Sequence, residues 1–547
     1  MNTVVNQKKN LVLLAVLLIA GCSGCASLIY QINWQRQLTT IFGLAHYATT
    51  LTILAFFVGF SLGAYLIKRF SHRLKNTLLL IACLEFVIGS YGIISFSGFE
   101  VLDNINGALS LTLVDSSTLL LSARAALCLL FLLLPTACMG ATVPCFLTAC
   151  IFADDERGER IGWITAANTL GALAGSVCTT WILMGLIHGQ DQMFIAAALN
   201  IVSAAMALIT YTVAAPAFNR KIAAPRLRSG SRPPKSNALT YAFMLSGAAS
   251  LGLQILWNRL AYISLEHTSF TFALVLSVFL SAYAAGAFCS SLWLRNRPAR
   301  RHTAALLQLA ALSCTLIGIL VFTNGLHYEQ LSRAIPYQLS AVAIISIYTF
   351  LPIFFIGCST PIILNLLSEG VTTLGHDTGR AMMMNNIGSI LAILIVGFIL
   401  IPVTNLYGVI LFCTLLLLGA VMLTAGTPKT KMQSQVIYPL GALCVAALLW
   451  LVPLDPYGAR YFSLYDEDPV WSAEDESGYW SVNEVSSQRG KMHYLYLNDM
   501  YENYLQSPAY GSIEGDFLLA TMIKPKIRSA YSIGLGLALE PYELLRF

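Results

Sequence analysis

Charged side chains are scarce in this chain. Asp, Glu, Lys and Arg make up only 11% of its 547 residues, against about 25% in an ordinary soluble domain, and 57% of the residues are hydrophobic. This shortage of charge excludes a chain that folds wholly in water and indicates that the lipid bilayer is its main partner. The net charge of +5 reflects basic loops, which in a membrane protein report orientation, so nucleic acid is not expected as a partner.

Cysteine is missing from the last part of the chain. All 13 cysteines lie between Cys22 and Cys444, and residues 454–547 contain none. This distribution argues against a disulfide framework or a paired-cysteine metal site, and no metal is expected. Two interpretations of Cys22 stay open: it follows Ile19-Ala20-Gly21 like the cysteine of a bacterial lipoprotein signal, or it is a small side chain of the first membrane helix.

Apolar runs of about 20 residues, long enough to cross a bilayer, recur along most of the chain. Thirteen are present, the last near residues 436–453. With a cytoplasmic N-terminus, 21 loop Lys and Arg residues face the cytoplasm and three face the other side, as the positive-inside rule requires. The odd number of spans then predicts an extracytoplasmic tail, which is acidic, with 14 acids and 7 bases.

The membrane part consists of two related halves. Gly24, Gln31, Trp34 and Arg36 recur as Gly247, Gln254, Trp257 and Arg259 at an offset of 223, and Asn168 and Gly171 recur as Asn385 and Gly388 at an offset of 217. The predicted domains are a six-helix repeat (1–214), a basic cytoplasmic linker (215–237), a second six-helix repeat (238–426), a linker with the thirteenth span (427–453) and a soluble tail (454–547). Each half has an even number of spans, so the two repeats are parallel.

Small residues four positions apart predict close helix packing. Gly59 with Gly63 and Gly171 with Gly175 form such pairs. Glu85, in the middle of the third span, is the clearest polar residue in an apolar run, and its repeat partner is Gln308. Glu85 is either a proton or cation site or a protonated carboxyl hydrogen-bonded to a neighbouring helix.

Further polar residues recur in both halves. Gln31, Trp34 and Arg36, with Gln254, Trp257 and Arg259, lie where the first helix of each half meets the outer interface. Interfacial anchoring and a substrate vestibule are both consistent with that position. Asn168 and Asn385 predict either interhelical hydrogen bonds or cavity-lining groups.

The tail has the pattern of a small α/β domain. Residues 493–497 alternate like a strand, Asn498-Asp499 predicts a turn, and Tyr501–Leu505 predicts a returning strand. Ile513–Ile523 predicts a helix. A strand over residues 530–536 then runs into Gly534-Leu535-Gly536, a weak signal for cofactor binding.

Together, the repeated Gln-Trp-Arg motif, the fourth span with Pro135 and Pro144, and the tail resemble the fused transporter-like (MFS-like) and spermidine-synthase-like membrane proteins of bacteria. The resemblance implies an all-α polytopic membrane protein of two parallel six-helix repeats plus a thirteenth span, followed by a small, truncated α/β tail. It also implies a bacterial inner-membrane location. Decarboxylated S-adenosylmethionine is the implied cofactor, with Asp499, Gly534 and Gly536 as its contacts.

The chain departs from that family where the chemistry would occur. Met500 replaces the glycine of the turn, and Phe547 comes before the catalytic aspartate that would deprotonate the attacking amine. Aminopropyl transfer is therefore not expected from this chain alone, although a second chain could complete the tail. The alternatives are a transporter of a small amine or other polar solute, using Glu85, Gln308 and the repeated Asn and Gln positions along the interface between the halves, or a non-catalytic assembly protein.

Overall fold

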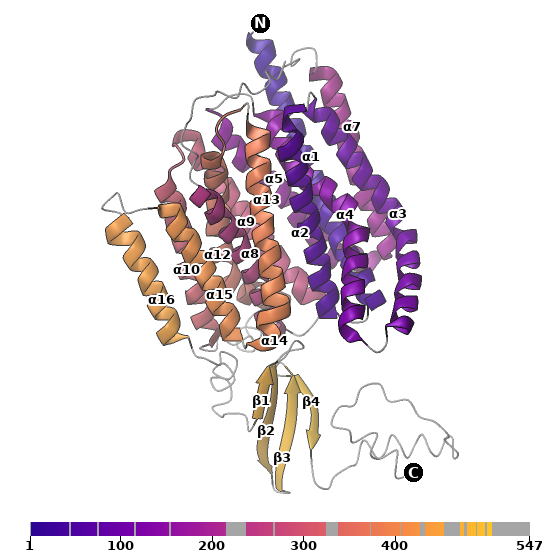
Figure 1. Cartoon of the computed structure of the whole chain (residues 1–547), viewed down its shortest axis with the longest axis vertical. Coiled ribbons are helices and arrows are strands. Elements are labelled where there is room, and N and C mark those ends of the chain that lie inside the picture. The colour runs from indigo at the N-terminus through magenta and orange to yellow at the C-terminus, as the bar shows by residue number, and fades with distance from the viewer. Residues whose placement is uncertain are drawn as a thin grey trace.

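The computed structural model describes residues 2–42, 45–73, 76–113, 116–151, 155–214, 237–265, 269–323, 337–371, 373–404, 406–426, 433–452, 471–474, 479–487, 490–497 and 500–505. The helices stand side by side in one bundle, with the N-terminus at one end and a small sheet beyond the other (Figure 1). We call the end with the N-terminus the linker end, because the first half ends and the second half starts there. We call the end with the sheet the tail end.

Two sets of six long helices build the bundle, and short segments complete some of them. The first half comprises α1 (Asn2–Phe42), α2 (Ala45–Phe70) with η1 (Ser71–Arg73), α3 (Thr77–Thr112), α4 (Ser117–Cys150), α5 (Arg157–Val177) with η2 (Cys178–Leu183) and α6 (Met184–Leu186), and α7 (Gly189–Ala214). The second comprises α8 (Asn237–Leu265), α9 (Ser269–Asn296), α10 (Arg301–Thr323), α12 (Tyr337–Leu367), α13 (Leu374–Ile395) with η4 (Val396–Leu400) and α14 (Ile401–Val403), and α15 (Leu406–Ala425). Cys22 lies inside the continuous helix α1, as the helix interpretation requires.

Among the described residues, twelve helices are long and apolar enough to cross a membrane, which corrects the predicted thirteen. The thirteenth segment forms η5 (Gln433–Ile437) and α16 (Tyr438–Leu451), whose apolar stretch Gln435–Leu451 is shorter than the other spans. At 1.5 Å per residue, a helix of this length covers only about 25 Å of a hydrocarbon core about 30 Å thick. It packs beside α10 on the outside of the bundle, where Cys444 Sγ lies 3.4 Å from Ser313 Oγ (Figure 1).

The repeated glycines lie where helices of the same half cross. A Cβ on Gly63 would overlap Ala137 of α4, and a Cβ on Gly286 would overlap the equivalent Phe354 of α12. A Cβ on Gly171 would overlap the backbone of α1, and a Cβ on Gly388 would overlap the backbone of α8. The structure thus confirms the predicted packing role, since the missing side chain lets two backbones approach closely.

Both halves also carry a π-helical turn at the same place. η2 ends at Leu183 and η4 ends at Leu400, two positions separated by the repeat offset of 217, and each is followed by a three-residue helix. A π turn widens the helix and disturbs its regular hydrogen bonding.

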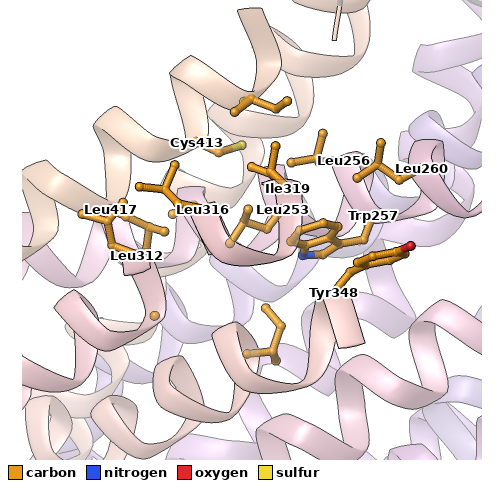
Figure 2. Close-up of a cluster of buried hydrophobic side chains, with 14 of the residues drawn as sticks. Leu253, Leu256, Trp257, Leu260, Leu312, Leu316, Ile319, Tyr348, Cys413 and Leu417 are labelled. Atoms are coloured by element: carbon orange, nitrogen blue, oxygen red, sulfur yellow. The ribbon is translucent and has the colours of Figure 1, made fainter. Parts of the chain in front are cut away.

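Each half has its own apolar core. In the second half, Trp257 of α8 stacks on Tyr348 of α12 with ring centroids 6.3 Å apart, among leucine and isoleucine side chains of α8, α10 and α15 (Figure 2). In the first half, Trp34 of α1 stacks on Tyr30 at 5.0 Å and donates a hydrogen bond from Nε1 to Ser95 Oγ at 3.1 Å. Trp34 is 0% exposed and Trp257 is 1% exposed. Interfacial anchoring is therefore wrong for both tryptophans, because each is a core residue of its half.

The described part of the tail is an antiparallel sheet in the order β1 (Trp471–Glu474), β2 (Tyr479–Ser487), β3 (Gly490–Leu497) and β4 (Met500–Leu505). β3 and β4 pair as the predicted hairpin, from Leu497 opposite Met500 to His493 opposite Leu505, with an irregularity at Leu495 and Tyr496. The predicted turn at 498–499, the helix at 513–523 and the glycine turn at 534–536 lie outside the described residues.

Candidate functional site

Glu85 lies at the centre of a buried polar group inside the first half. Its side chain is fully buried in α3, and Asn200 of α7 donates a hydrogen bond from Nδ2 to Glu85 Oε2 at 2.6 Å. Ser23 of α1 lies within hydrogen-bonding reach of the same carboxyl group. Ser203 follows Asn200 by three residues on the same face of α7 and is also fully buried. Three helices of one half therefore meet around a single carboxyl group.

Several oxygens of this group have no hydrogen-bond partner among the described residues. They are Glu85 Oε1, Asn200 Oδ1 and Ser203 Oγ. Buried polar atoms in proteins are nearly always satisfied, because leaving one unpaired costs about 1–3 kcal/mol. A bound water, proton or cation can supply the partners that these oxygens lack.

Gln308, the repeat partner of Glu85, has a different environment. It is fully buried in α10, where Thr424 of α15 donates a hydrogen bond from Oγ1 to Gln308 Oε1 at 2.8 Å. Both partners are neutral, so the second half holds an interhelical hydrogen bond and no charge at this position. The hypothesis that Glu85 and Gln308 lie along the interface between the halves is wrong, because each bonds to a helix of its own half.

The two asparagines occupy equivalent helix crossings. Asn385 of α13 donates a hydrogen bond from Nδ2 to the carbonyl oxygen of Phe243 in α8 at 2.8 Å and lies against Gly247. Asn168 of α5 packs its backbone carbonyl against Gly24 of α1. Of the two predicted roles, Asn385 therefore has the interhelical bond, and both residues are half-buried.

The Gln-Trp-Arg motifs differ between the halves. Gln31 is half-buried and Arg36 is exposed, whereas Gln254 and Arg259 are each only 7% exposed. The repeat therefore preserves the residue types but not their surroundings. Asp499, Gly534 and Gly536, the predicted cofactor contacts, lie outside the described residues.

A polar cleft opens between the two halves at the linker end. Its volume is about 590 Å³. It is lined by the start of α5 with the loop before it, the end of α9 with the loop after it, and the end of α12 with the residues that follow, including Asp155, Arg157, Arg295, Arg297 and Glu369. At its base Arg157 Nε donates a hydrogen bond to Asn365 Oδ1 at 2.8 Å and so links the halves. Gly158 packs against the same asparagine.

Sequence reasoning missed Asn200, Ser203 and Ser23 around Glu85, and Thr424 beside Gln308. Asn200 and Ser203 could have been noticed as polar residues three apart in the middle of an apolar run. Serine and threonine carry no such signal, because they are common in membrane helices, where their hydroxyls bond the preceding turn.

Comparison with solved structures identifies the fold. The crystal structure of a bacterial homologue of the iron transporter ferroportin, in an outward-facing state, has a TM-score of 0.51 and 13% identity over 76% of this chain and 98% of that one. The same homologue with soaked iron gives a TM-score of 0.50 over the same shares. A Major Facilitator Superfamily transporter, FucP, in its outward conformation gives 0.48 at 12% identity, over 75% of this chain and 97% of that one.

At this low identity the ferroportin likeness shows the fold alone: the twelve long helices of the membrane part are arranged as in that homologue. No family model matches the chain, and neither does any curated protein. The comparisons therefore give no support to the predicted spermidine-synthase-like fusion.

Proposed function

We propose that the protein is a membrane transporter for a small polar solute, which passes between its two six-helix halves. The observation that carries this proposal is the pairing of two repeat-related, parallel halves in a transporter fold. In transporters of this construction, the halves rock against each other and expose a path first to one side of the membrane and then to the other.

The contacts at the linker end are those that such a movement must separate. The halves meet there through polar links such as Arg157 with Asn365, and through a buried apolar cluster that joins Phe146 and Ile161 of the first half to Leu294 and Leu374 of the second. The charged cleft beside them favours a polar solute over an apolar one.

The aminopropyltransferase interpretation has less support. Of the tail features that resemble a spermidine synthase, the described residues include the β3–β4 hairpin alone. Antiparallel hairpins occur in many unrelated folds. Transport needs none of the tail chemistry, so it is the function we put forward.

A disulfide across the linker end tests transport. Ser71 in η1 belongs to the first half and Gly375 in α13 to the second, and a Cβ on Gly375 would lie 3.3 Å from Ser71 Cβ. That separation is close to the Cβ–Cβ distance of about 3.5–4.5 Å in disulfides. In a variant without native cysteines, we expect Ser71→Cys with Gly375→Cys to cross-link on mild oxidation and hold the linker end closed.

The assay is uptake of radiolabelled solutes by proteoliposomes, with a panel of amines, amino acids, sugars and carboxylates. We expect uptake of one class by the reduced double variant, its loss on oxidation and its return on reduction. Each single-cysteine variant is the control and should transport equally in both conditions. Absence of uptake across the whole panel, or uptake unaffected by the cross-link, would contradict the proposal.

A further inference from the structure

We propose that the first half contains a binding site for a monovalent alkali cation, built by Glu85 of α3, Asn200 and Ser203 of α7, and Ser23 of α1. This site lies within one half and not between the halves. Its existence does not depend on the transport function proposed above.

The donor atoms are of the kind that alkali cations bind. Glu85 supplies a carboxylate, Asn200 an amide oxygen, and Ser23 and Ser203 supply hydroxyl oxygens, and hard cations prefer oxygen ligands. Glu85 Oε1, Asn200 Oδ1 and Ser203 Oγ all lack a partner within the described part of the chain, and all three residues are fully buried. One cation can bind several of these oxygens at once, whereas a proton on Glu85 can bridge the carboxyl group to only one neighbouring acceptor.

The charge of the site favours a monovalent ion. Glu85 carries the negative charge of the group, and its contacts among the described residues, Ser23 and Asn200, are neutral. A monovalent cation would make the buried group neutral, but a divalent ion would leave an uncompensated positive charge, which is costly inside a membrane protein. Among the described residues, no three His, Cys, Asp or Glu side chains are grouped to hold a metal ion, so a multi-carboxylate site of the calcium type is not formed there.

The packing around the site holds the donors together. Gly89, one turn after Glu85, brings α3 close to α7: a Cβ on it would lie 3.1 Å from the carbonyl oxygen of Ala197 and 3.2 Å from Asn200 Cβ. A larger residue at this position would push Asn200 away from the carboxyl group. Gly89 therefore sets the spacing between α3 and α7, although it is not itself a donor of the site.

The second half supplies an internal comparison. The position of Glu85 is occupied by Gln308, and at the offset of 217 the positions of Asn200 and Ser203 are occupied by Leu417 and Ala420. All three are fully buried, and Gln308 bonds to Thr424 instead. Ser23 recurs as the buried Ser246, so the second half keeps the serine but lacks the carboxylate and the donors of Asn200 and Ser203.

The test is thermal unfolding of the purified full-length protein with increasing NaCl, with choline chloride keeping the ionic strength constant. We expect a saturable rise in the unfolding temperature of about 2–5 °C, because a ligand that binds only the folded state stabilises it. Glu85→Gln should abolish the rise. Gln308→Leu, at the matching position of the second half, should keep it.

A second variant covers the case in which Glu85→Gln does not fold. Ser203→Ala removes one neutral donor and should raise the NaCl concentration at half-maximal stabilisation by about tenfold. Equilibrium binding of radioactive ²²Na⁺ should give one ion per chain. An unfolding temperature that does not respond to NaCl, or that follows pH alone because the carboxyl group is merely protonated, would overturn the proposal.

Discussion

Gly171 of α5 lies directly against the carbonyl oxygen of Gly21 in α1, so closely that a methyl group on Gly171 would overlap that oxygen. Gly388 of α13 makes the same approach to Met244 of α8 in the second half. Both halves therefore contain the same crossing, at which two helix backbones touch. This crossing requires a residue without a side chain at Gly171 and at Gly388.

Gly171→Ala should destabilise the protein by about 1–3 kcal/mol, because the added methyl group forces α1 and α5 apart. Gly107→Ala is the matched control. A Cβ on Gly107 meets nothing within 4 Å, and alanine is the better helix former, so the control should be neutral or more stable. Thermal unfolding of both variants by intrinsic fluorescence checks the pair, and equal stabilities would contradict the overlap at Gly171.

Trp34→Ala should cost about 3–5 kcal/mol, since it empties a fully buried site and removes the stacking on Tyr30. Trp450→Ala is the comparison, because Trp450 lies on α16 and is 91% exposed in the bundle. Its loss should change the free energy of unfolding by less than about 0.5 kcal/mol. A larger effect for Trp450 than for Trp34 would mean that the tryptophan of α1 is not a core residue.

The hydrogen bond between Thr424 and Gln308 should appear as coupling in a double-mutant cycle. Thr424→Val and Gln308→Leu each leave one buried partner unpaired, whereas the double variant removes both groups. We expect a coupling energy of about 0.6 kcal/mol and at most about 1.7 kcal/mol, the average and the maximum found for hydrogen bonds between membrane helices. Strict additivity of the two single effects would show that the bond adds no stability.

The N-terminus and the sheet should face opposite sides of the membrane, because they lie at opposite ends of the bundle: α16 runs back from the linker end to the tail end, although it is shorter than the twelve long spans (Figure 1). In a variant without native cysteines, an impermeant maleimide on intact cells should label a cysteine at Ser486 in β2, whereas a cysteine at Asn296 at the linker end should react only after permeabilisation. The reason is that basic residues collect at the linker end, which the positive-inside rule places in the cytoplasm. The reverse pattern would invert the predicted orientation.

The two six-helix halves could be predicted from the sequence because both signals are carried by the sequence itself. Apolar runs give the spans, and identical residues at a fixed offset, such as Gly24 and Gly247, give the two halves. The β3–β4 hairpin was predictable for the same reason, since its alternation and turn lie within a few residues of each other.

What the sequence could not predict depends on contacts between distant positions. The sequence of α1 alone suggests that Trp34 is an interfacial anchor. It is a core residue because α3, with Ser95, packs against it. Glu85 was noticeable from its position, but its partner Asn200 is 115 residues away, and nothing local connects them. The thirteenth segment was counted as a span because its residues are apolar, but its helix ends at Leu451 and its apolar stretch is shorter than the twelve others.

The two halves share a π-helical turn at the same position. A π turn requires extra backbone within an otherwise regular helix, and η2 and η4 end at equivalent residues, Leu183 and Leu400, with short helices of equal length after them. The two halves therefore share an irregularity of the backbone as well as residue types. They share it although their offsets differ by six residues and although Glu85 of one half corresponds to Gln308 of the other.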